Sequence, residues 1–391
     1  MSTMNPFEVL FSEGAADDPH AAYAQLRTCP VTRGDFIGEP AVFLTRYDDV
    51  LWALRHPEVF SSAEGAIDMG QPVPLLPLQV DPPEHSRYRR FLNPKFVPRA
   101  VGELEPAITE RAKALVDAVA GDGRCDFHAD IATPLPSGLF LPLLGLPEED
   151  LPKFLGWRDD TIRPPYDPDD PTSGDRVRAA ASRAIHEYFV AAVAGLREGG
   201  GSGLLADLAT ATVEGERLTD VELLGICHLL LLGGLDTVTA TLDCAVVHLA
   251  AHPEQRAALV ADPSRWPAVI EELLRHQTPV QIVPRIVTTD IEIGGVQLRA
   301  GDRATLVLGA ANVDPEMWEE PESVELDRDS ARHLAFGGGN HLCLGAHLAR
   351  LELRVTLETW HAAVPDYEIA DGADLRFSPG IRQVAALPLR W

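Results

Sequence analysis

The spacing of apolar residues along the chain predicts a mostly helical protein. Within residues 98–119, apolar side chains recur at intervals of three, four and seven residues, which places them near one face of a helix. Strands are predicted at 41–46 and 304–308, and Gly294-Gly295 between two alternating runs predicts a hairpin. Further helices are predicted over 48–55, 151–162, 176–197, 253–261, 264–276 and 345–364. The expected fold class is mainly α with small β-sheets.

The longest predicted helix begins at a capping box, Thr219 to Glu222, and runs to about residue 251, where His252-Pro253 stops it. It would be about 48 Å long at 1.5 Å per residue. Most of its faces are apolar, which predicts that it crosses the interior of the protein. Its longest apolar run, 223–235, contains His228 and is shorter than the roughly 20 residues of a membrane span.

The middle of this helix carries the sequence GGLDT, 233–237, which is locally unfavourable for a buried helix. Gly233 and Gly234 each cost about 1 kcal/mol relative to alanine, and Asp236 must be satisfied if it is buried. Thr237 can bond back to a helix carbonyl and bend the helix. Three such choices within five residues indicate a functional site. The alternative is a helix packing groove with a solvated Asp236.

Composition and charge exclude several classes of function. The chain has 391 residues, 46% of them hydrophobic, and a formal net charge of −26, which argues against nucleic acid or an anionic membrane as partner. Its five cysteines are scattered, as is typical of a reducing compartment. The first thirty residues lack a basic and an apolar segment, so no signal peptide is expected. A soluble, cytoplasmic protein is predicted.

The decapeptide FGGGNHLCLG, 336–345, holds the strongest chemical signal. Cys343 follows a glycine-rich turn and precedes the predicted helix 345–364, whose positive end lowers a thiol pKa and favours the anion. Such a thiolate could be a nucleophile, a zinc ligand or an iron ligand. Zinc normally needs a second ligand at short spacing, and the nearby His341 alone makes a poor structural site. An axial haem ligand needs only one cysteine.

The longer stretch FGGGNHLCLGAHLAR resembles the haem-binding signature of the cytochrome P450 haem-thiolate monooxygenases. Its fixed positions fall on Phe336, Gly337, Gly339, His341, Cys343 and Gly345. The resemblance implies haem b (iron protoporphyrin IX), with Cys343 as the iron ligand, Phe336 beside the sulfur and His341 on a haem propionate. It also implies one cytochrome P450 domain over residues 1–391, a triangular prism with a long central helix over the haem.

Other motifs, in the same order as in the family, extend this resemblance over about residues 80–350. GGLDT is similar to the oxygen-binding motif, in which Gly233 and Gly234 make room for dioxygen while Asp236 and Thr237 deliver protons. Positions equivalent to propionate ligands are His85, Arg89 and Arg285, and positions equivalent to a structural ion network are Glu272, Arg275 and Arg328. Val313 stands where many relatives carry arginine, which weakens one local contact.

Partners and substrate are predicted more coarsely. No dinucleotide-binding or FMN-like segment follows the haem region, so electrons are expected from a ferredoxin and an NAD(P)H-dependent ferredoxin reductase. A basic patch, predicted to dock that ferredoxin, comprises Arg87, Arg90, Lys95 and Arg99. An apolar substrate such as a terpenoid, steroid or polyketide is expected. Candidate lining residues, each with ordinary core packing as the alternative, are Ile67, Val73, Leu75, Leu76, Leu232 and Val283.

The segment 163–175 is rich in proline and aspartate and is either a lid over the substrate entrance or an ordinary solvated loop. The expected function is that of a monooxygenase that inserts one atom of O2 into a C–H or C=C bond of an apolar small molecule. Two alternatives are a peroxide-driven peroxygenase and a haem-thiolate sensor or ligand-binding protein. The pair Asp236-Thr237 argues against both alternatives, since it supplies the proton relay that oxygen activation needs.

Overall fold

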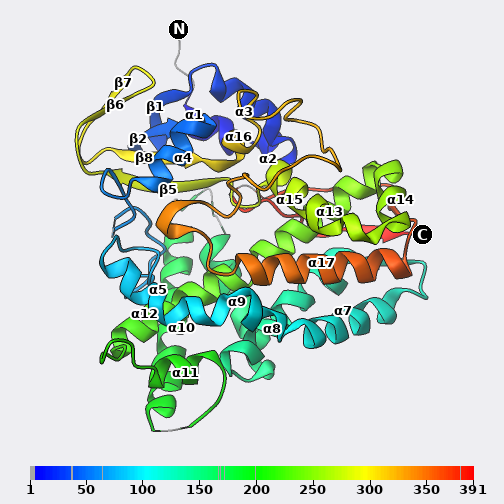
Figure 1. The fold of residues 1–391 in the computed structure, drawn as a ribbon, viewed down its shortest axis with the longest axis horizontal. Helices are drawn as coiled ribbons and strands as arrows, with labels where there is room; N and C mark the ends of the chain where they lie inside the picture. Colours follow the sequence, from blue (N-terminus) through cyan, green and yellow to red (C-terminus); the bar gives the residue numbers. More distant parts are fainter. Residues whose placement is uncertain are drawn as a thin grey trace. The chain divides into compact units, whose positions relative to one another are not determined.

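The computed structural model describes residues 5–36, 38–63, 65–165, 167, 169–170, 172–198, 200–378 and 380–391. Helices predominate in this part of the chain, and its strands form three small sheets (Figure 1). Two compact units are distinguished. The first comprises the residues up to Ser61, Val101–Leu135 and Thr237–Trp391, and the second comprises Ser62–Ala100 and Pro136–Asp236. The single domain over 1–391 stays a prediction.

The first unit holds all the strands of the described residues. The five-stranded sheet has the order β1-β2-β8-β5-β3, and the smaller sheets are β4-β10-β9 and β6-β7. Only β2 and β8 pair in parallel; all other pairs are antiparallel. The strands are β1 (Val31–Phe36), β2 (Glu39–Leu44), β3 (Phe60–Ser61), β4 (Arg124–Asp126), β5 (Ile282–Val287), β6 (Ile291–Ile293), β7 (Val296–Leu298), β8 (Arg303–Val307), β9 (Glu368–Ile369) and β10 (Pro388–Arg390).

The helices of the first unit cover both faces of the five-stranded sheet. Val42 and Leu44 of β2 pack with α4, whereas Ala41 and Phe43 point to the opposite face and pack with α1 and α3, because successive strand side chains alternate (Figure 1). The helices are α1 (Pro6–Leu10), α2 (Glu13–Asp17), α3 (Pro19–Arg27), α4 (Tyr47–Arg55), α7 (Glu105–Val119), α13 (Thr237–Ala251), α14 (Pro253–Ala261), α15 (Trp266–Gln277), α16 (Leu308–Asn312) and α17 (Ala346–Ala363).

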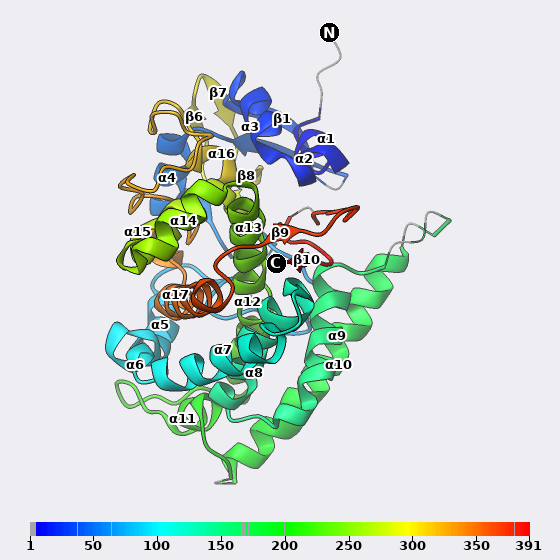
Figure 2. The same ribbon diagram turned by 90° about the vertical axis from the view of Figure 1, so that its right-hand side faces the viewer.

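The second unit is helical. Its long helix α10 lies beside α9 (Figure 2) and also packs against α12. Aromatic rings of Phe154, Trp157, Tyr188 and Phe189 fill the α9–α10 interface at centroid separations of 5.0–6.0 Å. The helices are α5 (Glu84–Phe96), α9 (Leu151–Ile162), α10 (Ser173–Arg197), α11 (Leu204–Thr210) and α12 (Asp220–Gly234), while α6 (Pro98–Gly102) and α8 (Pro134–Leu144) each include residues of both units.

Two helices that the sequence predicts as continuous are interrupted. The prediction for 98–119 is wrong at residues 103–104, because Pro106 lacks an amide hydrogen and is tolerated only in a first helical turn, so α7 begins anew there. The prediction for 219–251 is wrong at residues 235–236, where the Leu235 carbonyl accepts a hydrogen bond from Arg158 instead of a helix amide. The hairpin at Gly294-Gly295 is confirmed, and both glycines have positive φ.

Residues 220–251 are the one segment of the described chain that is long and apolar enough to cross a membrane. Within its most apolar window, 67% of the residues are buried inside the protein. A buried core helix of a soluble protein has the same length and composition, so this segment is weak evidence for a membrane span.

A histidine cluster in the first unit predicts that acid destabilises the protein. Burial lowers the pKa of His276 to about 2 and that of His248 to about 4, and it also lowers the pKa of His20. These side chains bind protons near pH 6.5 when the chain is unfolded, so the stability that they contribute is present above pH 6.5 and is lost as pH falls towards the folded values. Burial raises the pKa of Glu352 to about 8. Between pH 8 and pH 4.5 the folded chain therefore binds one proton more at Glu352 than the unfolded chain does, which partly offsets the loss of stability in acid.

The free energy of unfolding should therefore decrease between pH 6.5 and pH 5, and His276→Gln should reduce that slope by up to about 1.4 kcal/mol per pH unit. Urea unfolding at each pH measures the slope. His347→Gln is the matched control because His347 is exposed. An equal slope in the wild type and in His276→Gln would contradict the prediction.

Candidate active site

Cys343 lies in an exposed loop between a short 3-10 turn, Gly339–His341, and helix α17. Its backbone amide donates to the Phe336 carbonyl at 2.9 Å, which closes the loop. Gly345 is the N-cap of α17, which is 18 residues long. The N-terminal end of a helix carries a partial positive charge, which stabilises a nearby anion. The sulfur is thus accessible to a ligand and placed where a thiolate is favoured.

The glycines of this loop have two different physical roles. Gly337 and Gly339 have φ angles of +71° and +62°, which side chains rarely adopt. A Cβ at Gly339 would also overlap the Leu54 carbonyl of α4, so only glycine lets the loop approach that helix. A Cβ at Gly345 would meet nothing within 4 Å. The loop therefore packs on one side and is open on the other.

An ion network that the sequence analysis missed holds Phe336 in place. The Arg350 guanidinium lies 4.5 Å from the Phe336 ring centroid and pairs with both oxygens of Glu271 at 2.6 and 2.7 Å. His333 contacts the same carboxylate at 3.2 Å. Burial opposes ionisation of Glu271, yet hydrogen bonds from Arg350 and His333 outweigh it and lower its pKa to about 2. Arg350 is the last residue of the motif FGGGNHLCLGAHLAR, so the motif itself could have indicated that Arg350 has a role.

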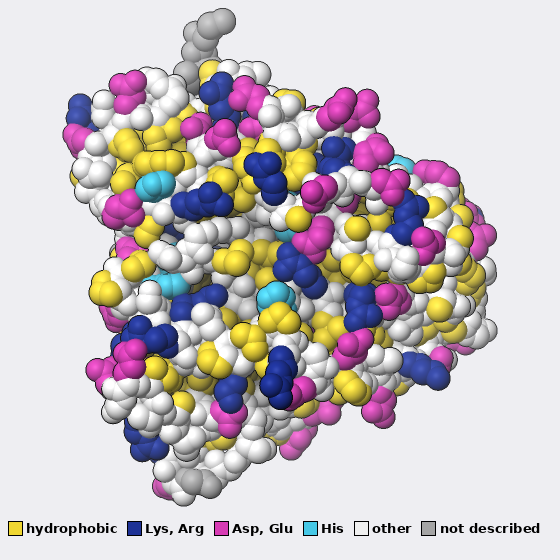
Figure 3. All heavy atoms as spheres, viewed as in Figure 1, with side chains coloured by type: hydrophobic (Ala, Val, Ile, Leu, Met, Phe, Trp, Pro, Cys, Tyr) yellow, Lys and Arg dark blue, Asp and Glu magenta, His cyan; other side chains and the backbone are white. Residues whose placement is uncertain are grey.

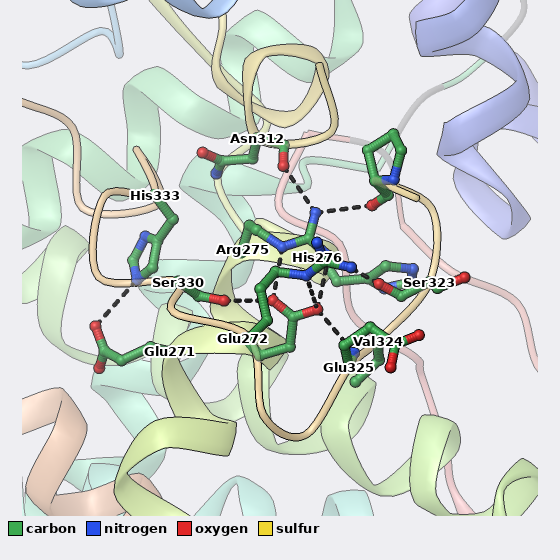
Figure 4. Close-up of polar contacts among 12 residues, drawn as sticks. Glu271, Glu272, Arg275, His276, Asn312, Ser323, Val324, Glu325, Ser330 and His333 are labelled. Carbon is green, nitrogen blue, oxygen red and sulfur yellow. Dashed lines mark hydrogen bonds and ion pairs between the residues drawn. The ribbon is translucent and has the colours of Figure 1, made fainter. Parts of the chain in front are cut away.

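Behind the loop, the structure brings together the three residues predicted as a structural network (Figure 4). Arg275 donates to both oxygens of Glu272 at 2.7 and 2.8 Å, and Arg328 donates to Glu272 at 3.0 Å. Ser330 and the Glu325 amide complete the shell of the carboxylate. The remaining N–H groups of Arg275 donate to the backbone carbonyls of residues 312, 321 and 323. Several chain segments thus meet at one charge cluster.

The predicted propionate ligands divide between the two units. His85 and Arg89 share one face of α5 in the second unit, whereas Arg285 of β5 and His341 belong to the first. Burial and the charge of Arg89 lower the pKa of His85 to about 4, so His85 is neutral at pH 7. A neutral His85 can hold a propionate by N–H donation while Arg89 supplies the positive charge.

The two glycines of the oxygen motif face different surroundings in the second unit. Gly233 is exposed within the otherwise largely buried α12, and a Cβ there would meet nothing within 4 Å. A Cβ at Gly234 would overlap the ring of Phe140 from α8. Gly233 therefore leaves room for a ligand, whereas Gly234 lets a neighbouring helix approach.

These surroundings predict opposite effects for two matched variants. Gly233→Ala should stabilise the fold by up to about 1 kcal/mol, because alanine favours the helix and meets open space. Gly234→Ala should destabilise it by about 1–3 kcal/mol, because Phe140 must move. Denaturant midpoints of the two variants and the wild type measure both effects. Effects of the same sign would contradict this assignment of the two positions.

Asp236 is fully buried and ion-paired rather than solvated. Arg163, at the C-terminal end of α9, donates to its two oxygens at 2.8 and 2.9 Å, and Arg158 lies 3.7 Å from the same carboxylate. Asp236 ends the second unit, and Thr237 begins α13 in the first. The Thr237 carbonyl accepts from the Thr241 hydroxyl at 2.7 Å. Sequence analysis missed both arginines, because only the fold brings them to Asp236.

Two of the predicted substrate contacts hold the 66–78 segment in place. Leu75 and Leu76 are buried, and the Leu76 amide donates to the Gly225 carbonyl at 3.3 Å. A Cβ at Gly225 would overlap the Pro74 carbonyl, so glycine permits this contact with α12. The other candidates are partly exposed: Ile67, Val73 and Leu232 in the second unit and Val283 in the first.

The basic patch predicted to dock a ferredoxin is largely neutralised by neighbouring acids. Arg87 pairs with Glu216 at 2.8 Å and with Glu222 at 2.5 Å. Arg90 pairs with Glu214 at 3.2 Å, Lys95 pairs with Asp207, and Arg99 is exposed. Figure 3 likewise shows many basic side chains beside acidic ones. Because these acids follow in sequence more than 100 residues later, linear charge counting overstated the patch.

The residues present fit a haem held by one thiolate. Among the described residues, no group of three or more histidine, cysteine or acidic side chains could hold a metal ion. The exposed Cys343 at the start of α17 is suited to one axial bond to porphyrin iron, and Gly233 leaves space beside its own helix. Cationic and N–H donors for carboxylates are present at Arg89, Arg285 and His85.

Comparisons with known proteins agree with this fit. A family model for cytochrome P450 matches residues 266–360. The chain is 34% identical over 393 residues to the vitamin D(3) 25-hydroxylase of Pseudonocardia autotrophica, covering 97% of this chain and 95% of that one. It is 35% identical over 367 residues to a steroid C26-monooxygenase of Mycobacterium tuberculosis, covering 93% and 91%.

Among solved structures, CYP109E1 from Bacillus megaterium in complex with testosterone matches with a TM-score of 0.90 and 28% identity, over 97% of this chain and 99% of that one. This agreement confirms the predicted fold class, mainly α with small sheets. The chain therefore belongs to the cytochrome P450 family and is a bacterial-type, haem-dependent monooxygenase.

Proposed function

We propose that this enzyme hydroxylates a C–H bond of an apolar molecule of steroid, terpenoid or polyketide size, using electrons from a ferredoxin and its NAD(P)H-dependent reductase in the cytoplasm. The accessible Cys343 at the positive end of α17 is the observation that carries the proposal. The substrate class is supported by relatives named for vitamin D(3) and steroids and by the solved complex with testosterone.

Each predicted site residue has a distinct task in this proposal. Cys343 would bind the iron of a haem that supplies oxygen activation, and His85, Arg89, Arg285 and His341 would bind its propionates. Phe336 would shield the sulfur, fixed from behind by Arg350.

Asp236 and Thr237 would move protons to bound oxygen. In the structure the Asp236 carboxylate is ion-paired with Arg163, which begins the 163–175 segment. This ion pair must open before Asp236 can transfer protons. We propose that this segment, in which residues 166, 168 and 171 lie outside the described part of the chain, acts as a lid. Arg163 would then release the Asp236 carboxylate when the lid opens. Glycines 233 and 234 would shape the space in which oxygen binds.

The proton relay predicts a specific kinetic defect. Thr237→Ala and Asp236→Asn should each lower product formation by about 10²-fold, the scale of lost general acid–base catalysis, while NAD(P)H consumption falls less. The ratio of product to NAD(P)H consumed measures this uncoupling. Thr241→Val, one turn later on α13, is the matched control and should keep the wild-type ratio. Unchanged ratios in both motif variants would contradict the assigned roles.

Two experiments test the proposed function. An optical titration of the purified holoenzyme with a library of steroids, terpenoids and macrolides should identify molecules that displace iron-bound water and shift the Soret band to shorter wavelength. Reconstitution should then give hydroxylated product with NAD(P)H only when ferredoxin and reductase are added. Turnover with NAD(P)H alone would contradict the electron route, and efficient turnover with peroxide alone would favour a peroxygenase.

A further inference from the structure

Two histidines meet between α10 and α12 of the second unit, outside the site described above. His228 is 2% exposed, in the middle of α12, and His186 is partly buried on α10. Their ring centroids are 5.9 Å apart with an interplanar angle of 65°. Phe189, one turn after His186 on the same face of α10, lies 6.1 Å from the His228 ring. The pair therefore faces the packed interface between these two helices.

Both histidines have ring nitrogens that the fold does not satisfy. His186 Nδ1 and His228 Nε2 are buried, and neither has a hydrogen-bond partner among the described residues. Leaving a buried polar atom unpaired costs about 1–3 kcal/mol, so such atoms in a native protein usually serve a ligand or bind ordered water. A single ligand bound between the two helices would satisfy both ring nitrogens.

The ring separation suits coordination of one metal ion. With metal–nitrogen bonds of about 2.0–2.1 Å, each imidazole centroid lies about 3.2 Å from the ion, so the two centroids are about 5.2 Å apart at a tetrahedral angle and about 6.4 Å apart when opposite. The observed 5.9 Å falls between these limits. Imidazole nitrogen is a preferred ligand of Zn²⁺, Cu²⁺ and Ni²⁺.

We propose that His186 and His228 form a binding site for a divalent transition-metal ion that bridges α10 and α12. No group of three or more potential protein ligands exists among the described residues, so water completes the coordination from the side of the partly exposed His186. Cys227 is excluded as a third ligand because neighbouring residues on a helix do not share a face. The site is independent of the haem.

The bridge would have a consequence for the enzyme, and this step rests on the proposed function. Helix α10 begins at Ser173, inside the 163–175 segment, and α12 ends with the two glycines of the oxygen motif. An ion that ties the two helices would restrain the movement of α10 against α12 and slow substrate entry. The metal site would thus be inhibitory, and stopped-flow measurement of substrate binding would show a slower rate with Zn²⁺.

Direct binding tests the site without relying on turnover. Zn²⁺ is the probe, because it is redox-silent and does not obscure the haem spectrum. The chelator-treated holoenzyme should bind Zn²⁺ in a saturable manner by calorimetry, and its Tm should rise with Zn²⁺ concentration. His186→Ala and His228→Gln should each weaken binding at least about tenfold, the scale seen when a metal site loses supporting groups.

A stacked histidine pair elsewhere in the described chain provides a matched control. His248 and His252 stack at 4.0 Å on α13, but His248 Nε2 is bonded to Gln255 and His252 Nδ1 to a backbone carbonyl. His248→Ala should therefore keep the wild-type affinity for Zn²⁺. Because His186 is only partly buried, its alanine variant is expected to fold, which circular dichroism confirms. Absence of saturable binding in the wild type, or full binding by folded His186→Ala, would overturn the proposal. If Zn²⁺ binds but does not slow substrate entry, only the proposed inhibition is refuted and the metal site stands.

Discussion

Replacing Glu272 with alanine is expected to lower the free energy of unfolding by about 3–5 kcal/mol and to abolish stable haem retention. The variant leaves the Arg275 guanidinium, which is fully buried, without its bidentate partner, and a buried unpaired charge is strongly destabilising. It also removes the anchor shared by Arg328, Ser330 and the Glu325 amide. Urea midpoints and the haem content of the purified protein measure the two effects.

Two controls separate the buried pair from general surface effects. Glu325→Ala should change stability by less than about 0.5 kcal/mol, because that side chain is exposed and only its backbone amide contacts Glu272. The double variant Glu272→Met/Arg275→Leu should recover part of the loss, since an apolar pair leaves no isolated charge. Wild-type stability in Glu272→Ala would show that the network is dispensable.

Replacing Cys343 is expected to have the largest effect on activity. Cys343→His should still bind haem, because imidazole is also an axial ligand, but it should lose product formation to below detection. Thiolate donates electron density that favours oxygen–oxygen cleavage, and neutral imidazole donates less. Cys29→Ser is the matched control, since Cys29 is also exposed. Monooxygenase turnover in Cys343→His at a rate comparable to the wild type would exclude Cys343 as the ligand.

Short stretches of sequence were sufficient to predict those features whose residues lie close together in the chain. The Cys343 loop is defined by glycines with positive φ and by the helix that follows, and all of these features lie within ten residues. The apolar run of β2 and the Gly294-Gly295 turn are local in the same sense. The hydrophobic pattern was likewise sufficient to predict that helices dominate.

Contacts between distant segments could not be read from the sequence. The partners of Asp236 lie 73 and 78 residues earlier, at Arg163 and Arg158, and no spacing rule connects them. Glu271 holds Arg350 across 79 residues. The neutralisation of Arg87 by Glu216 requires α5 to meet the segment before α12. In each case the fold decides which charges are paired.

The sulfur–iron bond of Cys343 is the central claim, and the absorption spectrum of the reduced holoenzyme under carbon monoxide tests it most directly. We predict a Soret band at the long-wavelength position characteristic of a thiolate opposite carbon monoxide. A freshly prepared, undamaged sample that absorbs where imidazole-ligated globins do, or that carries no porphyrin, would contradict the account.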